Sequence, residues 1–231
     1  MIKAVFLDID DTLLSFSGFV RQCMSEGFRH FHLKPFEEEM LPVFERINSG
    51  LWQRLERGEI TAEQLWEVRW SAIFRELGID FSGPVFEEYF RAQLFESAIP
   101  EPGAMEILNY LKNRYILCAA SNGPLLQQLN RLEKGGLTGC FHLIAVSSQI
   151  GAQKPDPAFF DYCFDRLRET ALPTLAPDEA IMIGDSVTSD IAGGQRYGMK
   201  TCLYQKKPRT KPLAVRPDYT IEKLEDITRF L

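Results

Sequence analysis

Cysteine is scarce in this sequence, and its distribution excludes disulfide-stapled and cysteine-zinc proteins. The 231 residues include five cysteines, scattered along the chain and without a Cys-x-x-Cys pair. An odd, unpaired set predicts neither a disulfide framework nor a zinc site, and it favours a reducing, cytoplasmic location.

Long apolar runs and an excess of basic residues are also missing. The longest apolar run, residues 115–120, is far shorter than the roughly 20 residues that cross a bilayer, and the run before Asp8 is too short for a signal peptide. The 26 basic residues are outnumbered by 32 acidic ones, so the net charge is −6, which argues against a nucleic-acid polymer as partner. The composition, 45% apolar and 25% charged, predicts an ordinary globular protein without a membrane partner.

Short apolar runs alternate with helix-compatible segments over most of the chain. The runs lie at residues 3–7, 115–120, 142–146, 180–183, 200–204 and, more weakly, 219–221. Helical patterns lie between them at residues 124–134, 157–168 and 188–197. This alternation predicts an α/β fold with a doubly wound parallel sheet, in which ligands bind at the carboxyl ends of the strands.

Residues 15–98 break the alternation with a pattern that is helical throughout. Five apolar side chains fall on one face of a predicted helix: Trp66, Trp70, Ile73, Phe74 and Leu77. We expect this stripe in the core, and glycines divide the segment into about four helices. The sequence therefore predicts an α/β core domain, residues 1–14 and 99–231, and an inserted helical domain over the carboxyl edge of its sheet.

Three aspartates crowd the loop after the first predicted strand: Asp8, Asp10 and Asp11. Like charges this close resist ionising together unless a cation or hydrogen bonds compensate. Oxygen ligands suit Mg²⁺, which is commonly shared with a substrate phosphate. The loop predicts a magnesium site, although acidic residues also occur in turns and helix caps.

Polar groups also follow other predicted strands. Asp185 and Asp190 follow the fourth run, while Ser121 and Asn122 follow the second and offer a hydroxyl and backbone N–H groups to an anion at a helix start. Lys154 supplies a cation before another helix. Alone, Ser121 as a helix cap and Lys154 as a solvated charge are the simpler interpretations, but together these groups point to one site.

Phosphoryl transfer is the chemistry that needs this set. Attack by an anion on a phosphate dianion is repulsive, so a metal cation, a lysine and N–H donors must spread the charge. A carboxylate nucleophile splits hydrolysis through an aspartyl-phosphate, and a second carboxyl must protonate the leaving alcohol and later activate water. Asp8 and Asp10, two apart on an extended chain and so on the same side, can divide these roles.

The motifs resemble those of the haloacid dehalogenase (HAD) superfamily, in the family's order. The matching residues are Asp8-Ile9-Asp10-Asp11-Thr12-Leu13-Leu14, Ser121 with Asn122, Lys154 with Pro155, and Gly184-Asp185 with Asp190. The resemblance covers the whole chain, because residues 15–98 are similar in position and size to the helical C1-type cap of one large subgroup. It implies a Rossmann-like core, an inserted all-helical cap domain and a Mg²⁺-dependent hydrolase.

The resemblance also implies a role for each matched residue. Asp8 would be the nucleophile and a Mg²⁺ ligand, Asp10 the general acid/base and a ligand through its backbone carbonyl, and Asp185 the third ligand from the protein. Asp190 would support the metal shell or Lys154, which is itself expected to act in catalysis. The phosphoryl group would be held by three residues: Ser121, Asn122 and Lys154.

One residue departs from the family pattern, because Asp11 stands where a glycine is common. The Asp-Asp-Thr-Leu form is similar to that of nucleotidase-like members acting on pyrimidine 5′-monophosphates. Parts of the helical segment resemble those members too: residues 52–58, 60–61, 69 and 77–79. The resemblance therefore implies a 5′-nucleotidase, with Asp11 either reshaping the loop or facing solvent.

The sequence is also compatible with other activities. Asp10 argues against carbon–halogen hydrolysis, because a halide leaving group needs no proton. A sugar-phosphate or phosphoglycolate phosphatase, or a phosphomutase, would keep both aspartates, and a non-catalytic binding or regulatory protein would keep the fold. The expected partner is a small-molecule phosphate monoester, and the chain is expected to be a monomer or homodimer.

Cationic side chains elsewhere are candidates for contacting an anionic substrate. In the helical segment these are Arg54, Arg57 and Arg69, although such side chains are more often solvated. The basic run at residues 206–211 leaves the fifth predicted strand on the active-site side and could steer anions. A solvated, proline-stiffened loop is the favoured interpretation of that run.

Overall fold

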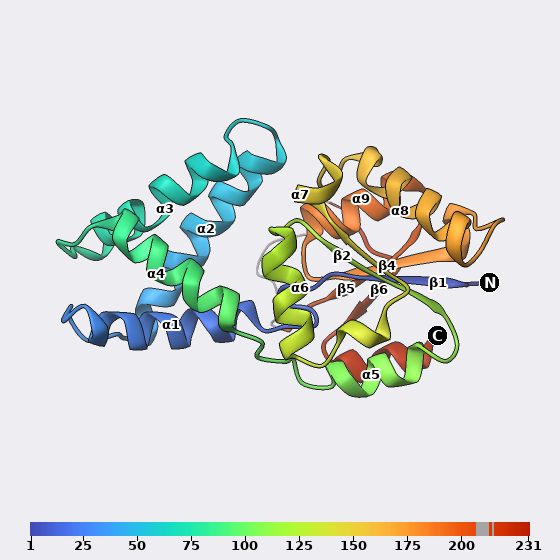
Figure 1. The fold of residues 1–231 in the computed structure, drawn as a ribbon, viewed down its shortest axis with the longest axis horizontal. Helices are drawn as coiled ribbons and strands as arrows, with labels where there is room; N and C mark the ends of the chain where they lie inside the picture. The colour runs from blue at the N-terminus through green and yellow to red at the C-terminus, as the bar shows by residue number, and fades with distance from the viewer. Residues whose placement is uncertain (207–212, 214) are drawn as a thin grey trace. The chain divides into compact units, whose positions relative to one another are not determined.

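The computed structural model describes residues 1–206, 213 and 215–231, and it divides into two compact units (Figure 1). One combines Met1–Ser15 with Ala98–Leu231, and the other is Phe16–Ser97. We call them the α/β unit and the helical unit. Within the described residues, no helix has the length and apolar character that crossing a bilayer requires.

In the described part of the chain, the α/β unit is built on six parallel strands in the order β3-β2-β1-β4-β5-β6 (Figure 1). The strands are β1 (Ala4–Leu7), β2 (Ile116–Ser121), β3 (Leu143–Val146), β4 (Ala180–Gly184), β5 (Lys200–Tyr204) and β6 (Tyr219–Ile221). Leu7 of β1 lies in register with Ala119 of β2 and Ile183 of β4. These three central strands therefore end side by side.

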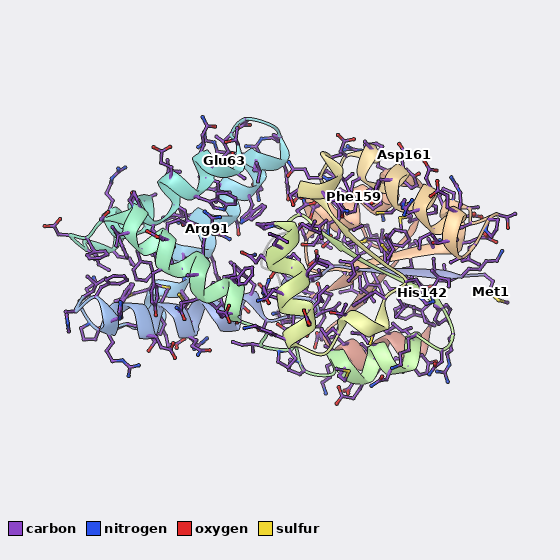
Figure 2. All side chains as sticks on the ribbon, viewed as in Figure 1. Met1, Glu63, Arg91, His142, Phe159 and Asp161 are labelled. Carbon is purple, nitrogen blue, oxygen red and sulfur yellow. The ribbon has the colours of Figure 1, made fainter. Side chains whose placement is uncertain are left out.

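Helices cover both faces of the sheet, as the alternating pattern predicts. They are α5 (Ala104–Leu111), α6 (Leu125–Lys134), α7 (Ser147–Ile150), α8 (Pro157–Thr170) and α9 (Ala192–Tyr197), with shorter helical turns at Thr138–Cys140, Pro177–Glu179, Val187–Ile191 and Leu224–Arg229. Along β1, Val5 and Leu7 enter the core that includes α5, while Phe6 enters the core that includes α8. Phe159, labelled in Figure 2, belongs to this second core. The predicted doubly wound α/β fold is confirmed.

Parts of the α/β unit differ from the sequence pattern. The pattern predicts neither α5 nor the short helix α7, and residues 188–197 are not one regular helix. They begin in a π-helical turn, Val187–Ile191, which continues into α9. Such wide turns often occur at functional sites, and this one carries Asp190.

The helical unit contains four main helices and one short turn. They are α1 (Phe16–His30), α2 (Leu41–Glu56), α3 (Ala62–Leu77) and α4 (Gly83–Glu96), with a turn at Glu38–Met40. Helix α3 begins in a capping box formed by Thr61 and Gln64 and ends at Gly78, whose φ of 64° lies in the left-handed region.

An aromatic core fills the helical unit. Trp70, Ile73 and Phe74 are buried, as the stripe predicts, and the Trp70 ring centroid lies 4.3 Å from that of Phe86. Trp66 and Leu77 are only partly buried. The guanidinium of Arg91, labelled in Figure 2, lies 3.9 Å from the Trp66 ring centroid. The middle of the stripe therefore packs in the core, while Trp66 and Leu77 at its two ends are partly exposed.

Arg69 fits neither of its two sequence interpretations, a substrate contact or a solvated charge, because its side chain is buried inside this unit. Nε and Nη2 donate to the two carboxylate oxygens of Glu87 at 3.0 and 2.6 Å, and Nη1 donates to Oδ1 of Asn48 at 3.0 Å. The guanidinium carbon lies 4.6 Å from the Phe90 ring centroid. Arg69 therefore anchors the helix core, whereas Arg54 and Arg57 remain exposed.

Replacing Glu87 with methionine should destabilise the helical unit by about 3–5 kcal/mol, since it leaves the Arg69 charge buried without its partner. Chemical unfolding followed by tryptophan fluorescence suits this test, because all three tryptophans lie in the helical unit. The Glu76→Met control breaks the exposed Arg46–Glu76 pair and should cost no more than about 1 kcal/mol. Equal losses of unfolding free energy in the two variants would contradict the role of Glu87 as partner of the buried Arg69 charge.

Candidate active site

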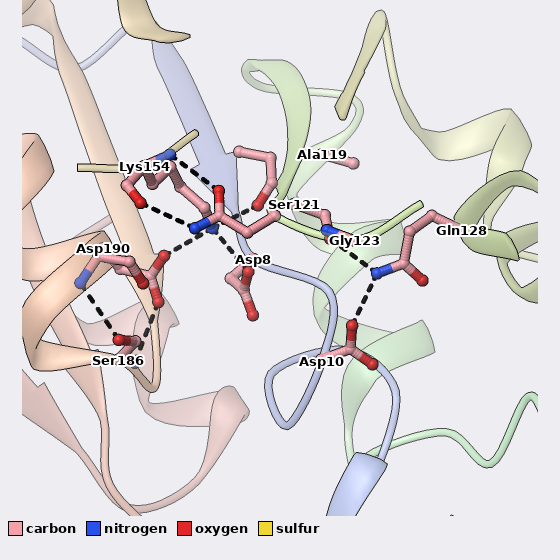
Figure 3. Close-up of polar contacts among 12 residues, drawn as sticks. Asp8, Asp10, Ala119, Ser121, Gly123, Gln128, Lys154, Ser186 and Asp190 are labelled. Atoms are coloured by element: carbon pink, nitrogen blue, oxygen red, sulfur yellow. Dashed lines mark hydrogen bonds and ion pairs between the residues drawn. The ribbon is translucent and has the colours of Figure 1, made fainter. Parts of the chain in front are cut away.

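The predicted motif residues converge at the carboxyl ends of the central strands. Asp8 directly follows β1 and donates its backbone N–H to the Ile183 carbonyl of β4 at 2.9 Å. Ser121 is the last residue of β2, and Asp185 directly follows β4. Figure 3 shows Asp8, Lys154 and Ser121 side by side at this edge.

Lys154 is the centre of the site, and its side chain is only 1% exposed. Its ammonium donates to Oδ1 of Asp8 at 2.7 Å, to Oδ1 of Asp190 at 2.7 Å and to the Ala120 carbonyl at 2.6 Å. A lysine has three N–H donors, so all three are used. Burial alone would lower the pKa of Lys154, but the Asp190 and Asp8 carboxylates outweigh it and the pKa is raised. The ammonium therefore stays charged.

Asp190 supports Lys154 through one oxygen and the strand-end loop through the other. Its Oδ2 accepts from the Ser186 backbone N–H at 3.0 Å. A Cβ on Gly184 would lie 2.1 Å from that oxygen, so only glycine allows the carboxylate to approach the end of β4 this closely.

Asn122 holds the main chain of Lys154. Its Nδ2 donates to the Lys154 carbonyl, and its Oδ1 accepts from the Lys154 backbone N–H, both at 2.8 Å. This reciprocal pair fixes the loop that carries the lysine. The side chain of Asn122 thus positions another residue, and its part in phosphate binding stays a prediction.

Asp10 and Ser121 both contact helix α6. The Asp10 carboxylate accepts from Arg131 Nη1 at 2.5 Å and from Gln128 Nε2 at 2.7 Å. The Ser121 hydroxyl oxygen accepts from Gln128 Nε2 at 2.7 Å and from the Gly123 backbone N–H at 3.1 Å. Ser121 is therefore not the N-cap of α6, a position that Pro124 occupies.

Asp11 adopts a conformation that explains why a glycine is common at its place. Its φ is 56°, in the left-handed region that aspartate tolerates better than most residues, and its backbone N–H donates to the Leu14 carbonyl at 2.7 Å. The carboxylate accepts from Lys206 Nζ at 2.8 Å, and Lys206 also donates to Glu101 at 2.6 Å. Asp11 therefore keeps the loop geometry and adds an ion pair.

The ion pair between Asp11 and Lys206 removes one charge from the basic run at residues 206–211, which could steer anions. The ammonium of Lys206 is engaged by two carboxylates, Asp11 and Glu101, so this residue does not present an unpaired charge to an approaching substrate. Residues 207–211, the rest of the run, lie outside the described residues.

Three carboxylates at this edge of the sheet could hold a metal ion. Oxygens of Asp8, Asp185 and Asp190 lie within 4.8 Å of one another. Burial raises the pKa of Asp8 to about 7, with Asp190 and Asp10 adding to the effect and Lys154 opposing it. Burial followed by the charges of Asp8 and Asp190 raises the pKa of Asp185 well above its ordinary value. A divalent cation would relieve this repulsion, and an all-oxygen donor set suits Mg²⁺.

The sequence motifs give no sign of two site residues, Gln128 and Arg131. A glutamine and an arginine three positions apart on a polar helix usually face solvent. Their spacing does place them on one face of α6, but only the fold shows that this face meets Asp10.

The family model for haloacid dehalogenase-like hydrolases matches residues 2–198. YfnB of Bacillus subtilis, which carries the name HAD-hydrolase, is 31% identical over 99% of this chain and 95% of its own length. The pyrimidine 5′-nucleotidase YjjG of Escherichia coli is 29% identical over 98% of this chain and 96% of its own length.

Solved structures of haloacid dehalogenase-like proteins are also similar to this chain. The crystal structure of YfnB bound to magnesium matches with a TM-score of 0.88 and 31% identity, covering 100% of this chain and 98% of that one. An L-2-haloacid dehalogenase from Xanthobacter autotrophicus matches with a TM-score of 0.75 at 19% identity, covering 99% and 98% of the two chains, which shows a shared fold.

The chain belongs to the haloacid dehalogenase-like hydrolase family. The predicted family is confirmed, and the nucleotidase relatives fit the predicted pyrimidine nucleotidase-like subgroup. The family and its named phosphatase and nucleotidase members also support the predicted enzyme class, phosphoric monoester hydrolase.

Mg²⁺ should raise the unfolding temperature more at about pH 8 than at about pH 5. The pKa of Asp8, about 7, lies above its ordinary value of 3.8, so the metal-free folded state holds this proton more tightly than the unfolded chain does. The contribution of Asp8 to stability therefore falls as pH rises from about 4 to about 7. Asp185 acts in the same direction, and cation binding must displace these protons.

Differential scanning calorimetry with and without Mg²⁺ checks this prediction. Asp185→Asn should reduce the Mg²⁺-induced shift, while Asp165→Asn, at an exposed position of α8, should leave it as in the wild type. A shift of the same size at both pH values would contradict the assignment.

Proposed function

We propose that the protein is a Mg²⁺-dependent phosphomonoesterase that works through an aspartyl-phosphate on Asp8 and acts on pyrimidine nucleoside 5′-monophosphates. One observation carries the proposal: two carboxyl groups of the same loop have separate sets of donors. Asp8 lies against the buried ammonium of Lys154, and Asp10 lies against Gln128 and Arg131. A nucleophile and a proton donor need this kind of division.

In the first half-reaction, a carboxylate oxygen of Asp8 forms a bond to phosphorus as the bond from phosphorus to the ester oxygen breaks. The ester oxygen keeps the electron pair and takes the proton of the Asp10 carboxyl, and the alcohol leaves. Lys154 and the Ser121 hydroxyl would bind the non-bridging phosphoryl oxygens, so the charge of the transition state is spread over fixed groups.

In the second half-reaction, water attacks phosphorus and gives a proton to the Asp10 carboxylate. The bond between phosphorus and the Asp8 oxygen breaks, inorganic phosphate leaves, and both aspartates return to their starting forms. A single residue can serve both halves, because the proton that Asp10 loses in the first is regained in the second.

The carboxylates of Asp8 and Asp185 and the backbone carbonyl of Asp10 would hold Mg²⁺. When bound, the metal supplies positive charge that offsets repulsion between the nucleophile and the phosphate. Asp190 would act on this site through Lys154, because both of its carboxylate oxygens accept hydrogen bonds from Lys154 and Ser186.

The substrate class rests on the relatives named as pyrimidine 5′-nucleotidases and on the Asp10-Asp11-Thr12-Leu13 sequence. We further propose that residues 15–98 serve as the cap domain that selects the leaving group. A monomer or homodimer remains our prediction for the assembly.

Asp8→Asn should lower phosphatase activity by on the order of a thousand-fold or more, because it removes the nucleophile with almost no change of volume. Phosphate release in the presence of Mg²⁺ measures the loss, and circular dichroism checks the fold. Asp11→Asn makes the same chemical change three residues later in the same loop and should stay within about tenfold of the wild type. Substantial turnover by folded Asp8→Asn would contradict the covalent mechanism.

A substrate panel tests the nucleotide assignment. We expect kcat/KM for UMP and CMP to exceed that for AMP, sugar phosphates and phosphoglycolate, with phosphate release abolished by chelator and restored by Mg²⁺. Preference for a sugar phosphate or phosphoglycolate would overturn the substrate class while leaving the reaction intact. Isomerisation without phosphate release would indicate a phosphomutase, and no turnover at all would indicate a binding protein.

A further inference from the structure

Two buried side chains of α6 lie against the proposed general acid and the proposed phosphate ligand. Gln128 and Arg131 are one turn apart and fully buried. They contact residues from two different strand ends, Asp10 after β1 and Ser121 at the end of β2. Figure 3 shows Gln128 between the Asp10 carboxylate and the Ser121–Gly123 turn.

Every polar group of the Gln128 side chain is used. Its Nε2 donates to Asp10 Oδ2 and to Ser121 Oγ, both at 2.7 Å, and its Oε1 accepts from Arg131 Nη1 at 2.9 Å. An amide with both N–H groups and its oxygen engaged cannot rotate without losing hydrogen bonds in a buried place, where each loss is costly. The orientation of Gln128 is therefore fixed by the contacts that it makes.

Arg131 completes the hold on Asp10. Its Nη1 donates to Asp10 Oδ1 at 2.5 Å, while Gln128 binds Oδ2. Both oxygens of the carboxyl group thus face donors on α6, yet 35% of the Asp10 side chain remains exposed. The carboxyl is held in one orientation with an open side that a leaving group or a water can reach.

The hydrogen bonds that Ser121 accepts leave its hydroxyl as a donor. A serine oxygen has two acceptor sites and one O–H donor. Gly123 N–H and Gln128 Nε2 fill the two acceptor sites, so the O–H is left to donate, as binding a phosphoryl oxygen requires. A Cβ on Gly123 would lie 2.7 Å from Gln128 Nε2, so a larger residue here would displace this amide.

We propose that Gln128 and Arg131 are positioning residues: together they hold the Asp10 carboxyl for proton transfer, and Gln128 keeps the Ser121 hydroxyl as a donor to the phosphoryl group. The inference rests on the proposed function. As the ester bond breaks and its oxygen takes the proton of Asp10, negative charge develops on that carboxyl. The Arg131 guanidinium and the Gln128 N–H lie where they stabilise this charge.

The selective test compares leaving groups. A nucleotide or other alkyl monoester needs a proton on its leaving oxygen, whereas dinitrophenolate leaves without one. In Gln128→Met and Arg131→Met, kcat/KM for the best alkyl substrate should fall by about 10²-fold or more, the usual contribution of a general acid. For dinitrophenyl phosphate the fall should stay within about tenfold. Gln127→Met, one residue earlier on α6, is the matched control and should change neither value appreciably.

A second readout separates the two residues. Gln128→Met should weaken competitive inhibition by inorganic phosphate by about three- to tenfold, the value of one hydrogen bond. Arg131→Met should not, because Arg131 makes no hydrogen bond with Ser121 in the described structure. Arg131→Lys keeps the cation and should recover part of the alkyl-substrate activity, and it serves in place of Arg131→Met if that variant does not fold.

Equal losses on alkyl and dinitrophenyl substrates, or no loss on either, would overturn the positioning role while wild-type activity upholds the proposed function. A wild-type protein that releases phosphate from neither substrate with Mg²⁺ would overturn the proposed function and this inference with it. Circular dichroism of each variant distinguishes loss of fold from loss of positioning.

Discussion

One buried ammonium group fixes the geometry of this site. Nζ of Lys154 binds the carboxylates of Asp8 and Asp190 and the carbonyl of Ala120. Asp8 directly follows β1, Asp190 lies in the π-helical turn after β4, and Ala120 belongs to β2. Leaving one of these carboxylates buried without a cation would cost several kcal/mol. Three neighbouring parts of the sheet edge therefore share one electrostatic centre, and the position of the proposed nucleophile depends on it.

Neighbouring residues fix the positions of Lys154, Asp190 and Asp10 by separate contacts. Asn122 binds both backbone polar groups of Lys154, and Gly184 lets Asp190 approach the end of β4. Helix α6 holds Asp10 independently of the lysine, through Gln128 and Arg131. Because the two carboxyl groups have separate supports, one can remain a nucleophile while the other gains and loses a proton.

Much of the fold was predictable because strands buried on both faces are continuous apolar runs, and the structure places a strand at each of the six predicted runs. The acidic residues and Lys154 were predictable as a group since parallel strands end at one edge. Gln128, Arg131 and the buried Arg69 were not, because polar residues on helices usually face solvent and only tertiary contacts bury them. The π-helical turn that carries Asp190 was likewise not predictable, because the sequence pattern there is that of a regular helix.

The proposed mechanism depends on the phosphorylation of Asp8, held against Lys154, during turnover. Acid quenching in the first turnover, followed by mass spectrometry of the N-terminal peptide, tests it most directly. We expect phosphate on Asp8 in the wild type, its disappearance as inorganic phosphate accumulates, and its absence in Asp8→Asn. Efficient turnover in which Asp8 never carries phosphate would contradict the proposed mechanism.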